Sequence, residues 1–222
     1  MVPITYFSDV LCVWAFIGEL RVAEVRRKFA EQVRFEHRFC SVFGDTEQKI
    51  GAGWADRGGY GGFNRHLHHS AEAFPEIRLH PDLWLTVRPA SSMGAHLLVK
   101  AAELAEAAGQ APEGASGRLL EALRRAFFVD GRDIATARVQ LDVAAGLDIS
   151  PQVLREFIDD GRAFAALSRD YQAAETLKIQ GSPSFVLNEG RQKLYGNVGY
   201  RIIEANIQEL LRSPQPDQAS WC

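Results

Sequence analysis

The chain has 222 residues, of which 46% are hydrophobic and 24% charged, and its formal net charge is −3. This length and composition are ordinary for a globular protein that buries a sizeable core, as one large domain or as one domain with an insert. A slightly acidic chain is not expected to bind nucleic acid, and no apolar run reaches the roughly 18 residues that a membrane span needs.

The N-terminal residues lack the basic and apolar segments of a secretory leader, because strand-like sequence begins at once. We therefore expect a cytoplasmic protein. That compartment is reducing, so its three cysteines are expected to be free or transiently oxidised rather than paired in stable disulfides.

Residues 3–18 run from a short apolar strand through a turn into a helix. Ser8 and Asp9 are turn formers, and Cys12 stands where the helix begins. Unpaired N–H groups and the positive end of the helix dipole favour a thiolate at such a position, where cysteine pKa values fall to roughly 3.5–7.5. The sequence thus predicts a reactive thiolate at Cys12. The alternative is a buried, inert thiol, which is common for free cysteine.

The predicted helix continues to about Glu31, since apolar residues recur at helical spacing. Residues 33–39 then alternate apolar and polar, which predicts a strand. Strand, helix and strand form a right-handed unit with parallel strands, so Cys40 and the loop of residues 41–50 are expected at the same sheet edge as Cys12.

Residues 51–64 are rich in glycine and are expected to form a loop, in which Trp54, Tyr60 and Phe63 pin or cover a pocket. Several histidines follow this segment, but no cysteine or carboxylate lies nearby with ligand spacing, so no metal site is expected. We expect them to line or cover the cleft. They are His66, His68, His69 and His80.

Residues 65–178 are expected to be helical throughout, with breaks at glycines and at the Ser150–Pro151 start signal. Residues 183–187 then predict a strand, 188–190 a hairpin turn and 192–195 the return strand. A last helix is expected from about Tyr200 to Leu211, followed by a flexible tail over residues 213–222.

Two distant segments carry a resemblance to a known family. Cys12-x-Trp14 at a helix start, with a distant Gly181-x-Pro183-x-Phe185, resembles the DsbA-like branch of the thioredoxin superfamily over residues 3 to about 212. This branch includes FrnE-type oxidoreductases, 2-hydroxychromene-2-carboxylate isomerases and kappa-class glutathione transferases. Residues 126–134 also resemble a stretch in the helical insert of these relatives.

The resemblance implies an α/β thioredoxin-like fold with an inserted all-helical subdomain. The thioredoxin-like domain is expected to comprise residues 1–52 and 179–212, and the insert residues 53–178. The resemblance also implies that Pro183 is cis and faces Cys12.

One position departs from the oxidoreductase pattern. Those relatives carry Cys-x-x-Cys, whereas this chain has Cys12-Val13-Trp14-Ala15 and so lacks the second cysteine. The isomerase and transferase relatives usually carry Ser at the first position. A dithiol mechanism is therefore not expected.

The predicted function is thiol–disulfide exchange through Cys12, with Trp14 and Pro183 beside it and glutathione or another thiol as the resolving partner. Two alternatives remain: a glutathione-dependent isomerase or transferase, and a redox-inactive binding protein on the same fold. The expected substrate is a small thiol or a disulfide, and a homodimer remains open. Glutathione is expected to bind near Ser182, Gly199, Tyr200, Arg201 and Lys49.

A resolving cysteine within the chain would have to be Cys40 or Cys222. A disulfide requires Cα atoms about 4.4–6.8 Å apart, which is a tight condition. We expect that neither forms a stable disulfide with Cys12, and that the protein acts as a monothiol.

Overall fold

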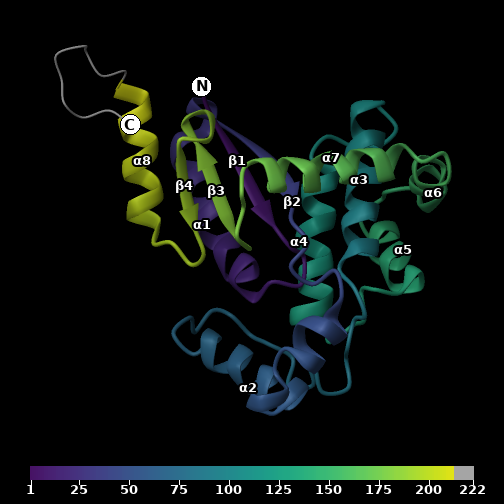
Figure 1. The fold of residues 1–222 in the computed structure, drawn as a ribbon. Coiled ribbons are helices and arrows are strands. Elements are labelled where there is room, and N and C mark those ends of the chain that lie inside the picture. The colour runs from purple at the N-terminus through teal and green to yellow at the C-terminus, as the bar shows by residue number, and fades with distance from the viewer. Residues whose placement is uncertain (213–222) are drawn as a thin grey trace.

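The computed structural model describes residues 1–212 (Figure 1). The predicted flexible tail and Cys222 lie outside the described residues. Within this part of the chain, no helix combines the length and the hydropathy that crossing a bilayer would require.

Four strands form one mixed sheet in the order β2-β1-β3-β4. Their bounds are β1 Val2–Ser8, β2 Val33–Phe39, β3 Ser184–Leu187 and β4 Gln192–Tyr195. β1 and β2 are parallel, with Val2 opposite Val33 and Ser8 opposite Phe39, whereas β3 is antiparallel to both β1 and β4. The carboxyl ends of β1 and β2 therefore meet the start of β3 at one edge of the sheet.

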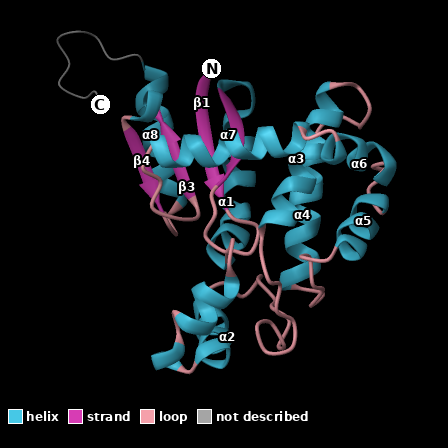
Figure 2. Cartoon of the chain, turned by 45° about the vertical axis from the view of Figure 1, so that its right-hand side comes forward, coloured by secondary structure: helices cyan, strands magenta, loops and turns pink. Residues whose placement is uncertain are grey.

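Helices cover both faces of this sheet (Figure 2). On one face lie α1 (Val13–Phe29) and α8 (Tyr200–Arg212), where Val25 packs in one core cluster with Ile203 and Ile207. On the other face α7 (Arg162–Thr176) contributes Ala174, which packs with Phe7 of β1. This burial on both sides accounts for the nearly continuous apolar run in β1.

The remaining helices lie between β2 and β3 in the chain. They are α2 (Gly59–Ala71), α3 (Met93–Ala107), α4 (Ala115–Phe128), α5 (Ala137–Ala145) and α6 (Pro151–Asp159). Ser150 caps α6 by accepting the N–H of Val153 at 3.4 Å, as the Ser–Pro start signal predicts. The turn that carries Cys12 packs in the same core cluster as α3 and α4, so the insert helps to form the site.

A buried ion pair fixes the insert to the sheet. Lys100 of α3 lies 3.1 Å from the carboxylate of Asp170 in α7, which also accepts the backbone N–H of Phe39 at 3.1 Å. Both charged side chains are nearly fully buried. Two insert helices are thereby held against the carboxyl end of β2, next to the candidate site.

The prediction of a loop over residues 51–64 is wrong. A π-helical turn spans Glu47–Ala52, and α2 begins at Gly59. The glycines there permit tight geometry: Gly58 has φ 89°, and a Cβ at Gly62 would lie 1.9 Å from the carbonyl oxygen of Arg57. Glycine composition in this segment reflects a sharp helix entry and a close backbone approach rather than an open loop.

This close approach predicts that Gly62→Ala destabilises the protein. Overpacking against a fixed carbonyl is expected to lower the free energy of unfolding by about 1–3 kcal/mol. Gly61→Ala is the matched control, because the nearest atom that its Cβ would meet is Arg65 Nη1, at an ordinary contact distance of 3.7 Å. Alanine there is expected to be neutral or to add up to about 1 kcal/mol through helix propensity. Urea unfolding of both variants tests this, and equal midpoints would contradict the close-approach argument.

Candidate functional site

Cys12 occupies the N-cap of α1, as the sequence predicts. Its carbonyl oxygen accepts the N–H groups of Ala15 and Phe16, each at 3.1 Å, which closes the first helical turn. Its own N–H donates to the carbonyl oxygen of Asp9 at 3.2 Å. The turn between β1 and α1 thus holds the thiol at the beginning of the helix.

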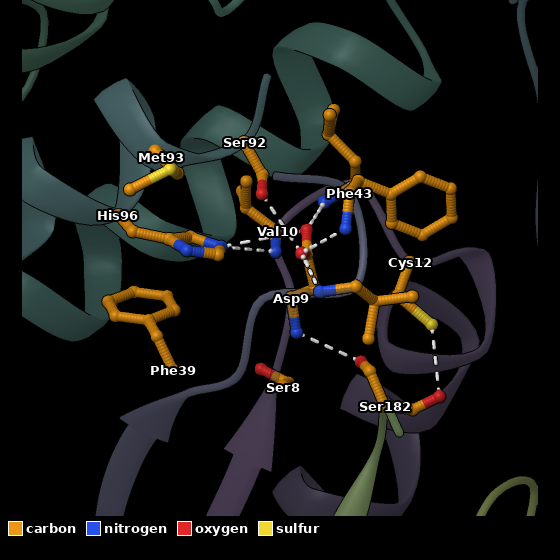
Figure 3. Close-up of polar contacts among 12 residues, drawn as sticks. Ser8, Asp9, Val10, Cys12, Phe39, Phe43, Ser92, Met93, His96 and Ser182 are labelled. Carbon is orange, nitrogen blue, oxygen red and sulfur yellow. Dashed lines mark hydrogen bonds and ion pairs between the residues drawn. The ribbon is translucent and has the colours of Figure 1, made fainter. Parts of the chain in front are cut away.

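The segment before β3 meets this thiol. The Ser182–Pro183 peptide bond is cis, and the Cys12 thiol donates to the carbonyl oxygen of Ser182 at 3.2 Å (Figure 3). The Ser182 hydroxyl oxygen accepts the N–H of Asp9 at 2.9 Å. Cys12, Ser182 and Pro183, which are far apart in the sequence, therefore form one site at the sheet edge. The Ser182 carbonyl is thus engaged by the thiol.

Asp9 is the buried centre of this site (Figure 3). One carboxylate oxygen accepts the N–H of Leu11 at 2.9 Å, and the other accepts the N–H groups of Val42 and Phe43 at 2.9 and 2.8 Å. The Ser92 hydroxyl donates to the second oxygen at 2.9 Å. This single carboxylate joins the β1–α1 turn, the loop after β2 and the residue before α3.

His96 of α3 lies beside this carboxylate. Its Nε2 atom is 3.0 Å from the backbone N of Val10 and 3.5 Å from an Asp9 oxygen, and its Nδ1 atom is 3.0 Å from the Tyr171 hydroxyl. Because Val10 N–H donates to Nε2, the neutral ring carries its proton on Nδ1 and donates it to Tyr171.

Burial alone would raise the pKa of the Asp9 carboxyl. The positive charge that His96 carries when protonated, and the N–H groups of Phe43 and Leu11, outweigh that effect and lower the pKa below its ordinary value. The local sequence marks Asp9 only as a turn former, and it does not mark Ser92 or His96. Their partners are distant in the chain, so no local pattern marks them.

The prediction that Cys12 has a lowered pKa is contradicted. Its side chain is 5% exposed, and burial raises the pKa of the thiol above its ordinary value. A hydrogen bond from the Ser182 side chain and the N–H of Ala15 lower the pKa in part, while the negative charge of Asp9 raises it further. The helix N-terminus is present as predicted, but desolvation outweighs it.

Trp14 lies next to the site, half-buried, with its ring 6.5 Å from that of Phe74 in an edge-on arrangement. Lys49 is exposed on the π-helical turn. The Tyr200 hydroxyl donates to Glu204, which is ion-paired with Lys28 near the end of α1. Lys28 follows Cys12 by a rise of about 24 Å along the helix axis, so the Tyr200 side chain is directed away from the thiol.

Gly199 and Arg201 flank Tyr200 where α8 opens. The Gly199 carbonyl accepts the N–H groups of the first helical turn, including that of Ile202 at 3.0 Å. Of the predicted site residues, the structure brings Ser182 and Pro183 to Cys12, directs the Tyr200 hydroxyl to Glu204 and leaves Lys49 exposed.

Cys40 is also buried, with its sulfur 3.9 Å from the carbonyl oxygen of Gly181. Burial raises the pKa of this thiol well above its ordinary value. Cys12 and Cys40 are both free in the structure. They contact neighbouring carbonyls of the same segment, Ser182 and Gly181.

Comparisons with known proteins place this geometry in a family context. Residues 3–208 match the family model described as a DSBA-like thioredoxin domain. A search of curated proteins finds no match.

Solved structures have the same fold at low identity. A probable DsbA oxidoreductase from Streptomyces coelicolor has a TM-score of 0.74 at 20% identity, over 98% of this chain and 93% of that chain. The cytosolic disulfide reductase DsbM from Pseudomonas aeruginosa with GSH has a TM-score of 0.64 at 21% identity, over 95% and 99%. A 2-hydroxychromene-2-carboxylate isomerase has a TM-score of 0.65 at 14% identity, over 95% and 96%. These matches confirm a thioredoxin-like α/β fold with a helical insert.

The burial of Cys12 predicts slow alkylation at neutral pH. The rate should rise with pH through an apparent midpoint above the ~8.5 of a free thiol, because only the thiolate reacts and burial disfavours it. The measurement is the pH dependence of iodoacetamide labelling of Cys40→Ala, which leaves Cys12 and Cys222 as the cysteines. Labelling at Cys12 is followed by peptide mass spectrometry. A midpoint near neutrality would contradict the effect of burial.

The contacts of Asp9 predict that Asp9→Ala lowers the free energy of unfolding by about 3 kcal/mol or more, because its buried donors lose their acceptor at about 1–3 kcal/mol each. Asp9→Asn keeps one acceptor oxygen and should cost less. Because the folded-state pKa is lowered, this stabilisation is complete above the unfolded pKa of about 3.9 and is lost as the pH falls through the folded value. Urea unfolding at pH 7 tests the order, and equal stability of Asp9→Ala and the wild type would refute it.

Proposed function

The chain belongs to the DSBA-like thioredoxin family, and on that premise we propose that it is a thiol–disulfide oxidoreductase that acts through the single thiol of Cys12. The observation that carries this proposal is the contact of the Cys12 sulfur with the Ser182 carbonyl, 3.2 Å away, beside the cis Pro183 and at the start of α1. A cysteine that served only to fill the core would require neither a position at a helix start nor a contact with the segment before β3.

In the proposed reaction the Cys12 thiolate attacks one sulfur of a disulfide. The S–S bond of the substrate breaks, a Cys12 mixed disulfide forms, and the departing thiolate takes up a proton. The Ser182 hydroxyl and the Ala15 N–H are the donors that favour the thiolate. Loss of the Cys12 proton also removes the donor to the Ser182 carbonyl, which then becomes available to an N–H of an extended substrate.

Resolution of the mixed disulfide needs a second thiol from outside the chain. The position three residues after Cys12 is Ala15, which is fully buried and carries no sulfur. We propose glutathione for this role and the cytoplasm as its setting, because the similar DsbM is a cytosolic disulfide reductase that was solved with GSH. Glutathione would bind at Ser182, with Lys49 and the backbone at the opening of α8, residues 199–201, as outer contacts.

A second candidate is a glutathione-dependent isomerase, favoured by the similarity to the 2-hydroxychromene-2-carboxylate isomerase and by the missing second cysteine. In that case the site would stabilise the thiolate of glutathione itself. Cys12 would then remain unmodified during turnover.

Oxidised glutathione is expected to add one glutathionyl group to Cys12 and to release one molecule of reduced glutathione. Added reduced glutathione should reverse the modification. Intact-protein and peptide mass spectrometry at pH 7 and pH 9 measure this, and the yield should be higher at pH 9 because more thiolate is present.

Two cysteine variants separate the candidate functions. Cys12→Ser should abolish the adduct at this position, whereas Cys40→Ala should retain it. A wild-type Cys12 that stays unmodified at both pH values would rule out the exchange reaction. Reversible binding of glutathione to Cys12→Ser, with no adduct on the wild type, would support the isomerase alternative.

A further inference from the structure

A second buried charged cluster lies behind the thiol, on the α1 face of the sheet. Arg124 of α4 is 2% exposed. Its Nη2 donates to the Ser8 hydroxyl at 2.6 Å and its Nη1 to the carboxylate of Glu19 at 2.8 Å. Neither the proposed exchange reaction nor the Asp9 contacts use this cluster. A guanidinium buried this completely is costly unless its charge is compensated.

The two partners of Arg124 are the chain segments on either side of Cys12. Ser8 is the last residue of β1 and directly precedes Asp9, whose carbonyl oxygen accepts the Cys12 N–H. Glu19 follows Cys12 by seven residues, so the two lie on one face of α1 with Ala15 between them. The guanidinium therefore lies along the helix face that carries the thiol, on the order of two helical turns or about 10 Å from it.

Opposite charges act on the thiol. The Asp9 carboxylate opposes a thiolate, and the Arg124 guanidinium favours one. Burial alone would lower the pKa of Arg124, but Glu19, Tyr6 and the Cys12 sulfur raise it above its ordinary value. The attraction between Arg124 and a Cys12 thiolate is therefore part of this arrangement.

Other titratable groups surround the cluster. His37 of β2 accepts or donates at the Ser8 hydroxyl, 2.7 Å away, and burial holds its pKa well below the ordinary range, so it is neutral near pH 7. The charged and titratable groups around Cys12 and Arg124 are Tyr6 of β1 and Asp9 after it, His37 of β2 and Cys40 after it, Glu19 and Arg26 of α1, His96 of α3 and Glu121 of α4. Of the two arginines in this region, Arg124 is buried, whereas Arg26 is exposed.

We propose that Arg124 is a positioning residue that stabilises the Cys12 thiolate through the buried interior, and that the Glu19 carboxylate limits this effect by neutralising part of the guanidinium charge. One helical turn before Glu19 stands Ala15, so there is no second thiol at this position on which the Arg124 charge could act. The role of the thiolate rests on the proposed function, whereas the electrostatic effect on Cys12 does not depend on it.

The proposal predicts opposite shifts from two neutral substitutions. Arg124→Gln should raise the midpoint of Cys12 alkylation by about one pH unit, the size expected for a unit charge about 10 Å away at an effective dielectric constant of about 20. Glu19→Gln should lower it by a similar or smaller amount. A loss of packing alone would expose the thiol in both variants and would shift both midpoints in the same direction.

Two controls make the test specific. Arg125→Gln removes the same charge from the next residue of α4, which is exposed, and should leave the midpoint unchanged because solvent screens it. Arg124→Lys keeps the charge and should stay near the wild-type midpoint. All variants carry Cys40→Ala, and their folding is checked by circular dichroism and urea unfolding.

The outcomes distinguish this proposal from the exchange function. Opposite shifts for Arg124→Gln and Glu19→Gln support it, even if glutathione never modifies Cys12. Unchanged midpoints, or shifts of one sign in both variants, overturn it, even if the exchange reaction is real. Should Arg124→Gln fail to fold, Glu19→Gln decides. A lower midpoint with an unchanged limiting alkylation rate at high pH supports the proposal, because added exposure of the thiol would raise that rate. An unchanged or higher midpoint, or a lower midpoint with a raised limiting rate, overturns it.

Discussion

A carboxylate removed from water must be compensated, and the burial of Asp9 imposes that requirement on the whole site. Four donors meet it, from the turn after β1, the loop after β2 and the Ser92 hydroxyl before α3. The loop after β2 and the residue before α3 are distant from Asp9 in the sequence, and these hydrogen bonds hold both of them beside it. Because Cys12 follows Asp9 by one turn and bonds to its carbonyl, the position of the thiol depends on this carboxylate being satisfied.

The same burial that fixes the thiol also keeps it protonated. A thiol with a raised pKa is protected from oxidation at rest, since oxidation follows thiolate character and exposure. The thiolate that does form is the more nucleophilic for its high pKa. Asp9 and Arg124 then act in opposite senses on a group that water screens little. The site therefore combines a scarce thiolate with high intrinsic reactivity, and a substrate that supplies new donors would shift the balance.

Local patterns predicted the features whose causes are local. The strand–turn–helix of residues 2–29 and the capped start at Ser150 depend on neighbouring residues, and both are found. The interactions of Asp9 with Phe43 and Ser92 span 34 and 83 residues, and that of Arg124 with Ser8 spans 116. No periodicity reports such pairs. The predicted pKa of Cys12 was wrong for the same reason, because the helix dipole is visible in sequence and desolvation is not.

The consequence of having alanine and not cysteine at position 15 depends on the packing around that position. Ala15 is fully buried on the helix face between Cys12 and Glu19, so no exposed side chain approaches a mixed disulfide from that side. Cys40 contacts the Gly181 carbonyl and packs with Ala174 and Val186, whereas Cys12 belongs to the core cluster of the insert. The two buried thiols thus belong to different core clusters, although both contact the segment before Pro183. On the proposed monothiol route, an exchange that began at Cys12 would end with a thiol delivered from solvent, and its rate would follow the concentration of that thiol.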